Sequence, residues 1–364
     1  MIEVSAPGKL MLSGEWSVLE IGNPAIVLAI DKKAKTKISQ SESIIVTAEQ
    51  VGVKNAKAVF DDEKIVFLGL TPNQEKGMVF VKAGMETALR YLTEKKVEIK
   101  GFHLETDSRE LHQSGEKLGF GSSAAITTSV VFAVLSHHGT EPENEELFKL
   151  STLAHYFAQG KIGSGFDVAA TVNGGALVYT RFDPDQIERL ALKPVNQALS
   201  EKWLGLSMKK ISLPQNMFFL VINTGKKADT RELVTKMKKF RTEKKHDYFR
   251  LINAVRETTS SLADALENSE LEKIIFLLKK NRLLLKELGQ KSGTNLETSE
   301  LTKIIEEAEM LGCAGKFSGA GGGDNAIAVG FGKEKKQELL NAFKNKGFRV
   351  IETSISENGV ELNA

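Results

Sequence analysis

Residues 117–125 read KLGFGSSAA, and the rest of the chain is interpreted outward from this stretch. Its two glycines let the backbone turn tightly and approach a ligand closely. The apolar run at 124–135 predicts a buried helix, which places Ser122 and Ser123 at the helix start. Free N–H groups and the helix dipole favour an anion at such an end. The stretch therefore predicts a phosphate-binding loop, with a plain helix cap by Ser122 as the alternative.

Two well-known phosphate-loop patterns do not fit this stretch. The G-x-x-x-x-G-K-[ST] order of a Walker A loop is absent, and no third glycine completes the G-x-G-x-x-G of a dinucleotide fold. Lys117 adds a positive charge, and the serine hydroxyls can donate to phosphate or bind magnesium. The loop is therefore predicted to bind phosphate without being a Walker A or dinucleotide-binding loop.

Two further stretches lie near the ends of the chain. Residues 6–20 read APGKLMLSGEWSVLE, and residues 316–324 read KFSGAGGGD. In the second stretch, residues 319–323 contain four glycines, and ordering so many glycines costs backbone entropy on folding. Close passage to a ligand would compensate for that cost, and a mobile surface loop is the alternative.

The composition is that of a globular protein without a bias toward polyanions. The 364 residues are 41% hydrophobic and 26% charged with a net charge of +2, so nucleic acid is not an expected partner. The single cysteine, Cys313, excludes an internal disulfide, and no zinc cluster is indicated. The N-terminus does not read as a signal peptide, and no apolar run reaches the roughly 18 residues of a membrane span. We therefore expect a cytoplasmic protein without membrane contact.

The length predicts two domains. Short apolar strands and glycine turns dominate the first half, whereas charged helical patterns at 230–266 and 271–288 dominate the second. The composition changes at 183–215, a stretch that contains three prolines. We therefore predict two domains, at 1–200 and 201–364. Mixed sheets with helices on one side favour an α+β class over a doubly wound sheet.

The three glycine-containing motifs resemble, in order, those of the galactokinase, homoserine kinase, mevalonate kinase and phosphomevalonate kinase (GHMP) superfamily. They read G-K-x-x-L-x-G-E, G-x-G-S-S-A and G-A-G-G-G and together span almost the whole chain. The resemblance implies a two-domain α+β GHMP kinase fold, with a ribosomal-protein-like N-terminal β-α-β domain and a ferredoxin-like C-terminal domain. Its β-α-β crossover would be left-handed, an exception to the usual rule. ATP would lie between the domains, over the loop at 119–123.

A fourth stretch narrows the resemblance. Residues 154–170 read AHYFAQGKIGSGFDVAA, which looks like the phosphomevalonate kinase branch rather than the mevalonate kinase branch. This implies phosphoryl transfer from Mg-ATP to the phosphate of 5-phosphomevalonate, giving 5-diphosphomevalonate and ADP, in the mevalonate route to isoprenoids. The alternatives are mevalonate kinase or another small-molecule kinase of the superfamily, and a catalytically silent ligand-binding regulator. Trp16 and Phe120 differ from the residues usual at these positions in the family. Both are apolar replacements, so they bear on which substrate is bound and not on the kinase chemistry.

The roles of Lys9 and Asp167 follow from the resemblance. Phosphoryl transfer requires an aligned acceptor and neutralised phosphate charge more than covalent help from the protein. Asp167 is the family's active-site aspartate, which could orient the acceptor, take a proton or hold Lys9; a helix cap is the alternative. Lys9 would stabilise the transferred phosphoryl group or the acceptor, and a solvated lysine is the alternative. A phosphate acceptor needs little deprotonation, since its second pKa is about 6.

ATP and Mg2+ are the implied cofactors. The predicted ATP-binding residues are Lys117, Gly119, Gly121, Ser122, Ser123 and Ala124, with Ser123 as the magnesium ligand. The predicted substrate-binding residues are Glu15, Lys161, Ser164, Gly165, Ser318, Gly319, Ala320 and Gly321. No acidic cage is expected, because magnesium keeps several waters. The expected partner is a small phosphorylated substrate, bound by a monomer or homodimer.

Two other features are interpreted as structural. His155 is expected to be a packed core group rather than a ligand. Residues 224–230 carry a basic pair before a helical pattern, and a helix cap is favoured over phosphate contact there.

Overall fold

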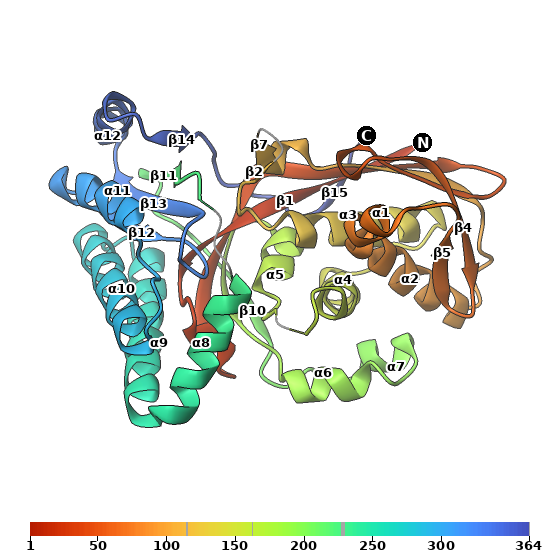
Figure 1. Cartoon of the computed structure of the whole chain (residues 1–364), viewed down its shortest axis with the longest axis horizontal. Helices are drawn as coiled ribbons and strands as arrows, with labels where there is room; N and C mark the ends of the chain where they lie inside the picture. The colour runs from red at the N-terminus through yellow and green to blue at the C-terminus, as the bar shows by residue number, and fades with distance from the viewer. Residues whose placement is uncertain (114–115, 162, 227–229, 364) are drawn as a thin grey trace.

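The computed structural model describes residues 1–113, 116–161, 163–226 and 230–363 and contains two main sheets with helices packed against them (Figure 1), besides a two-stranded sheet. Three hydrophobic clusters fill it, two within the two parts and one between them. No helix in the described part of the chain is long and apolar enough to cross a membrane.

The larger sheet forms from strands between residues 2 and 211 and from the last strand of the chain. Its strands are β1 (Ile2–Ser13), β2 (Pro24–Gln40), β3 (Ile44–Ala48), β4 (Val53–Asp61), β5 (Lys64–Phe67), β6 (Phe102–Asp107), β9 (Ala176–Thr180), β10 (Ser207–Ile211) and β15 (Glu361–Asn363). The main order is β10-β9-β2-β6-β3-β4-β5, and β1 pairs with β2 and β15. β6 and β9 are both antiparallel to β2, so they run parallel to each other and form the ends of a β-α-β unit.

Helices cover one face of this sheet (Figure 1). They are α1 (Pro72–Gly77), α2 (Val79–Glu94), α3 (Ser122–His137), α4 (Asn144–Ala158), α5 (Phe166–Asn173), α6 (Pro184–Leu190) and α7 (Val195–Ser200). Short elements complete this part: η1 (Ser17–Leu19), η2 (Glu49–Val51), η3 (Arg109–Leu111), β7 (His112–Gln113) and β8 (Glu116–Lys117). α3 is apolar nearly all round and is buried between the sheet and helices α2, α4 and α5. The predicted buried helix is confirmed.

The smaller sheet belongs to the second half of the chain. Its strands are β11 (Met217–Asn223), β12 (Ala314–Phe317), β13 (Asn325–Phe331) and β14 (Arg349–Ile351), in the order β12-β13-β11-β14 with antiparallel neighbours. Its helices are α8 (Thr230–Glu243), α9 (Lys245–Glu267), α10 (Leu271–Ser292), α11 (Ser299–Met310) and α12 (Lys333–Asn345). The chain order β-α-β-β-α-β with this strand order is ferredoxin-like, so the predicted α+β fold class is confirmed.

The long helical pattern predicted at 230–266 is divided into two helices, α8 and α9. The chain leaves helical geometry at Lys244, where φ is −127° and ψ is 53°. The break lets Phe240 and Tyr248 pack together in the same hydrophobic cluster from two different helices, with ring centroids 6.1 Å apart. The sequence around Lys244 contains no glycine or proline that would end a helix locally. The break is therefore attributed to tertiary packing rather than to local helix propensity.

Two short strands complicate a simple division of the chain. β10 and β15 both follow residue 200, yet both pair within the larger sheet. A boundary between residues 200 and 201 would therefore leave the larger sheet with strands from both domains. That boundary stays a prediction.

Candidate active site

The glycine loop before α3 has the backbone that its sequence predicts. Gly119 and Gly121 have φ of +74° and +76°, in the left-handed region that favours glycine. The loop is held from two sides: Lys9 N–H donates to the Phe120 carbonyl at 2.8 Å, and Asn325 Nδ2 donates to the Leu118 carbonyl at 2.5 Å. A Cβ on Gly121 would lie only 2.9 Å from Lys9 Cγ. The loop therefore joins both terminal motifs at one place.

The start of α3 presents backbone N–H groups that precede its first helical hydrogen bond. The first helical hydrogen bond of α3 runs from Ala125 N–H to the Gly121 carbonyl at 3.1 Å. The N–H groups of Ser122, Ser123 and Ala124 precede that bond and lie at the positive end of the helix dipole. The side chain of Ala124 is buried, so only its backbone can meet a ligand. This helix end can bind an anion.

Lys9 extends from β1 across the loop. Its Nζ donates to the Gly119 carbonyl at 3.0 Å and lies 5.5 Å from the centre of the Phe166 ring. Burial lowers the pKa of the Lys9 ammonium, while the carboxylates of Asp167 and Asp324 act in the opposite direction. Lys9 is thus a cation in a site of restricted solvent, rather than a solvated surface lysine.

Asp167, His155 and Ser123 lie in contact. Asp167 is the second residue of α5, and its Oδ1 accepts from the N–H of Val168 at 3.0 Å. Its Oδ2 lies 3.8 Å from His155 Nε2, which is also 3.0 Å from Ser123 Oγ. Burial lowers the pKa of the His155 imidazole, with Asp167 opposing that shift. A neutral imidazole therefore links the predicted catalytic carboxylate to the predicted magnesium ligand.

Glu15 is paired with Lys316 rather than with Lys9. Both side chains are 1% exposed or less, and Lys316 Nζ donates to Glu15 Oε1 and to the Phe317 carbonyl. Glu15 Oε2 has no protein partner among the described residues. Burial raises the pKa of the Glu15 carboxyl and lowers that of the Lys316 ammonium. The pair joins the first motif to the last.

Ser318 also joins those two motifs. Its hydroxyl accepts from the Met11 N–H at 2.9 Å and donates to the Met11 carbonyl at 3.0 Å. The hydroxyl is thereby engaged with β1, and Ser318 borders the site beside Gly319 and Ala320.

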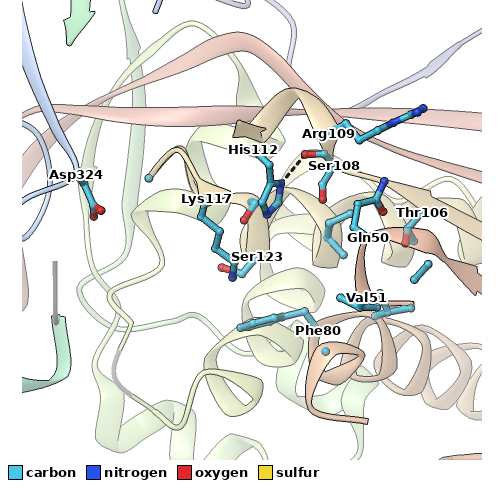
Figure 2. A pocket seen from close by; sticks show the side chains of 16 residues that line it. Gln50, Val51, Phe80, Thr106, Ser108, Arg109, His112, Lys117, Ser123 and Asp324 are labelled. Carbon is cyan, nitrogen blue, oxygen red and sulfur yellow. Dashed lines mark hydrogen bonds between the residues drawn. The ribbon is translucent and has the colours of Figure 1, made fainter. Parts of the chain in front are cut away.

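Two cavities meet at the loop. The large cavity, of about 850 Å³, includes Lys117, Ser122, Phe80 and Gln50 in its wall. In Figure 2, Lys117 and Ser123 lie between Asp324 on one side and Gln50, Val51 and Thr106 on the other. The small cavity, of about 260 Å³, has Lys9, Glu15, Asp167, Ser164 and Ala320 in its wall. Gly119, Ser123 and Asp324 line both cavities.

Three predicted substrate-binding residues do not line the small cavity. Lys161 is exposed and forms an ion pair with Glu188 at 3.1 Å, and its predicted role in binding the substrate phosphate stays a prediction. Gly165 and Gly321 lie behind the wall: a Cβ on Gly165 would meet Tyr179 and Phe182, and one on Gly321 would meet Leu296. Neighbouring protein atoms are therefore sufficient to explain glycine at both positions, and their predicted substrate binding stays a prediction.

Sequence reasoning missed three residues of this site. His155 is buried as expected, yet it also contacts Ser123; its spacing from Asp167 gave no signal of that contact. Lys316 and Asp324 stood at the ends of the last glycine motif without a predicted role, and the glycines between them were the only available sign. Of the stretch at 224–230, residues 227–229 lie outside the described residues, and Thr230 lines the small cavity.

The arrangement suits transfer of an anionic group. A helix N-terminus, a lysine and a carboxylate surround the junction of two cavities, so one ligand's anion can meet a second ligand there. No group of three or more histidine, cysteine or acidic side chains that could hold a metal occurs in the described residues.

Two family descriptions match the chain. Residues 80–175 match "GHMP kinases N terminal domain", and residues 261–349 match "GHMP kinases C terminal". The first contains the α3 loop and Asp167, and the second contains Lys316 and Ser318.

Individual relatives agree with these matches. The chain is 31% identical over 332 residues to the phosphomevalonate kinase of Streptomyces sp. (strain CL190), covering 89% of this chain and 88% of that one. It is 28% identical to the mevalonate kinase of Thermococcus sibiricus, and the match covers 98% of this chain and 97% of that one. The structure of Streptococcus pneumoniae phosphomevalonate kinase in complex with phosphomevalonate and AMPPNP matches with a TM-score of 0.84 and 25% identity, covering 98% of this chain and 100% of that one. With both domains matched, the chain belongs to the GHMP kinase family.

Proposed function

We propose that this protein transfers the terminal phosphoryl group of Mg-ATP to the phosphate of 5-phosphomevalonate, giving 5-diphosphomevalonate and ADP. Family membership makes it an ATP-dependent kinase. The observation that carries the proposal is the meeting of two cavities at Gly119, Ser123 and Asp324, with Lys9 and Asp167 on the side of the small cavity. ATP would occupy the large cavity, and the acceptor the small one.

The nucleotide phosphates would bind at the start of α3. Backbone N–H groups of Ser122 to Ala124 would donate to them, and Lys117 would add charge from the wall of the large cavity. The Ser123 hydroxyl fits a magnesium ligand, because it borders both cavities and contacts the neutral imidazole of His155. Bound magnesium would neutralise phosphate charge, and few protein ligands suffice because it keeps several waters.

The acceptor would meet Lys9 and Asp167. An acceptor phosphate is already anionic at neutral pH, so neutralising charge matters more than removing a proton. Lys9 would bring positive charge between the two phosphates. Asp167 would orient the acceptor and Lys9, and Glu15 lies in the wall of the small cavity, where it would border the acceptor. The Streptococcus pneumoniae enzyme, in complex with phosphomevalonate and AMPPNP, supports this pairing of ligands.

Mevalonate is a second candidate acceptor, because mevalonate kinases also match over nearly the whole chain. Its neutral hydroxyl would require Asp167 to act as a base. The 154–170 stretch, similar to phosphomevalonate kinases, favours the phosphorylated acceptor.

The test is ADP release by the purified protein with Mg-ATP and, separately, 5-phosphomevalonate, mevalonate, galactose or homoserine. We expect turnover with 5-phosphomevalonate alone, lost in Lys9→Ala and Asp167→Ala and kept in the exposed-residue controls Lys57→Ala and Asp264→Ala. Turnover with another acceptor alone would overturn the substrate but keep the kinase. Nucleotide binding without any turnover would instead indicate a silent ligand-binding regulator.

A further inference from the structure

A further cavity adjoins the small cavity and has no role in the chemistry described so far. This side cavity, of about 740 Å³, lies between η1, the chain after β9, and helices α8 and α9. Three apolar side chains, those of Trp16, Leu19 and Val234, line both cavities. They form a partition, and the small cavity of about 260 Å³ ends on this side at the partition.

Trp16 is the largest side chain of the partition and is tightly packed. Only 5% of the residue is exposed, and it belongs to a hydrophobic cluster that also contains Met237 and Tyr248. Apart from Trp16, the buried members of that cluster in the described ranges all follow residue 217. The indole ring therefore extends from the first motif of the chain into the core of its second half.

The backbone at Trp16 is unusual for a residue of this size. Its φ is +64° and its ψ is −41°, whereas a bulky residue rarely takes a positive φ. Such geometry is costly and persists only where the surrounding structure demands it, commonly beside a ligand site. The preceding residue, Glu15, is itself fixed by its pair with Lys316. An unfavourable backbone is thus maintained that places the indole ring in the partition.

Hydrogen bonding does not explain why a tryptophan stands at this position. The indole Nε1 is buried and has no hydrogen-bond partner among the described residues. A smaller apolar side chain would avoid the cost of that unpaired N–H group. The size of the ring is the property that matters here, because the ring closes the small cavity toward the side cavity.

The two boundaries of the small cavity differ in chemistry. At the boundary with the large cavity, Gly119 and Ser123 lie by the start of α3, and Lys9 donates to the Gly119 carbonyl. That boundary suits an anion, whereas the partition is apolar. An acceptor with its phosphate at the first boundary would therefore turn its hydrocarbon part toward the partition. In 5-phosphomevalonate this part carries a methyl group.

We infer that Trp16 sets the upper size limit of the acceptor, because it closes the small cavity against the side cavity. This inference deepens the proposed function and rests on it only in that the acceptor occupies the small cavity. Trp16 would select 5-phosphomevalonate over homologues that carry a longer alkyl group in place of the methyl group. Removing the ring would join the two cavities and admit such homologues.

The experiment compares 5-phosphomevalonate with the homologue in which a butyl group replaces the methyl group. The wild-type protein should use the homologue at least about 100-fold less well, as kcat/KM, because a closed apolar pocket discriminates against added methylene groups. Trp16→Ala should use the two acceptors within about 10-fold of each other, with KM for ATP unchanged, because the butyl group enters the side cavity. Trp16→Phe should keep most of the wild-type preference, since a phenyl ring still fills the partition.

The chain has two tryptophans, which provides a matched control and a second readout. Trp203 is 2% exposed and packs against Phe148 and Phe182, but it lines neither cavity. Trp203→Ala should lower stability without changing the preference between the two acceptors. In Trp203→Phe, all indole fluorescence comes from Trp16, and it should change when 5-phosphomevalonate binds.

The inference is overturned if the wild-type protein uses both acceptors equally well, or if folded Trp16→Ala still rejects the homologue. Unaltered Trp16 fluorescence on acceptor binding to Trp203→Phe would also contradict it. If Trp16→Ala does not fold, Val234→Ala replaces it, because Val234 is only partly buried. That variant should shift the preference toward the homologue by about 10-fold, and an unchanged preference would overturn the inference.

Failure of the proposed function gives a different result. If mevalonate alone turns over, the proposed acceptor is wrong, and mevalonate with its own butyl homologue provides the same test of Trp16. If no acceptor turns over, fluorescence titration of Trp203→Phe compares the binding of 5-phosphomevalonate and its homologue. Equal binding of the two would then refute the size limit.

Discussion

Lys9 is the residue on which the electrostatics of the site depend most directly. Its ammonium must be charged to lie between phosphates, and burial lowers its pKa below the ordinary lysine value of about 10.4. Because its pKa in the folded protein lies below the unfolded value, Lys9 costs stability at neutral pH, and stability rises as pH passes through the window between them. The same titration removes the cation that the reaction uses.

The first prediction concerns this titration. We expect kcat to fall on the alkaline side with an apparent pKa below that of an exposed lysine, since Lys9 loses its proton there. Lys9→Met should be inactive at all pH values. Any activity left in Lys9→Arg should lack this limb, because arginine stays charged. The measurement is a kcat profile from neutral to alkaline pH, and an unchanged limb in Lys9→Arg would refute the assignment.

His155 gives a second prediction at this scale. Its imidazole holds the Ser123 hydroxyl at 3.0 Å, so its loss should loosen the proposed magnesium ligand. We expect His155→Gln to raise the magnesium concentration needed for half-maximal activity by about 10- to 100-fold, as for residues that orient metal ligands. Magnesium titration of ADP release measures this. His246→Gln, at an exposed position, is the control, and an unaltered magnesium requirement in His155→Gln would contradict the prediction.

At the scale of the element, α3 allows a matched comparison of two glycines. Gly121 precedes the helix and Gly139 follows it, with φ of +76° and +73°. A Cβ on Gly121 would press on Lys9, whereas one on Gly139 would meet nothing within 4 Å. Both alanine variants carry the backbone cost of about 1–2 kcal/mol for left-handed geometry.

The third prediction is that these variants separate stability from activity. Gly121→Ala and Gly139→Ala should lower the melting temperature by similar amounts. Only Gly121→Ala should reduce kcat, by about 100-fold, because a shift of about 1 Å in Lys9 and the loop misaligns the phosphates. Thermal unfolding and ADP release measure the two effects. Comparable activity in both variants would mean that the loop adapts to a side chain at 121.

At the scale of the whole molecule, the buried Glu15–Lys316 pair links the two sheets. Glu15 follows β1 and Lys316 belongs to β12, and the hydrogen bonds of Ser318 to Met11 lie beside the pair. The hydrophobic cluster that contains Leu10, Leu28, Val221 and Leu278 continues the junction. The active site therefore forms only when both sheets are in place.

The fourth prediction tests that link. Lys316→Met leaves the buried Glu15 unpaired and should lower the free energy of unfolding by about 3–5 kcal/mol. The double variant Glu15→Gln/Lys316→Met should recover much of that loss, because no unpaired charge remains. Urea unfolding of both singles and the double gives the coupling. The control is Lys273→Met, which removes one partner of the exposed pair with Glu270 and should change the free energy of unfolding by no more than about 1 kcal/mol. If the losses in the Glu15 and Lys316 single variants simply add up in the double variant, the two residues are not coupled.

The sequence by itself determined the local parts of this protein. The glycines of 117–125 predicted a tight turn, the apolar run after them predicted the buried α3, and the order of motifs predicted the kinase family. These features follow from a few consecutive residues, whose backbone preferences and spacing act independently of the rest of the chain.

Only the tertiary structure decided which distant residues meet. Lys316 pairs with Glu15 across 301 positions, and His155 meets Ser123 across 32. The break at Lys244 and the return of β15 to the first sheet are likewise invisible in any local pattern. Such contacts are selected by burial over the whole chain, because an unpaired buried charge or an uncovered apolar face is costly wherever its partner lies in the sequence.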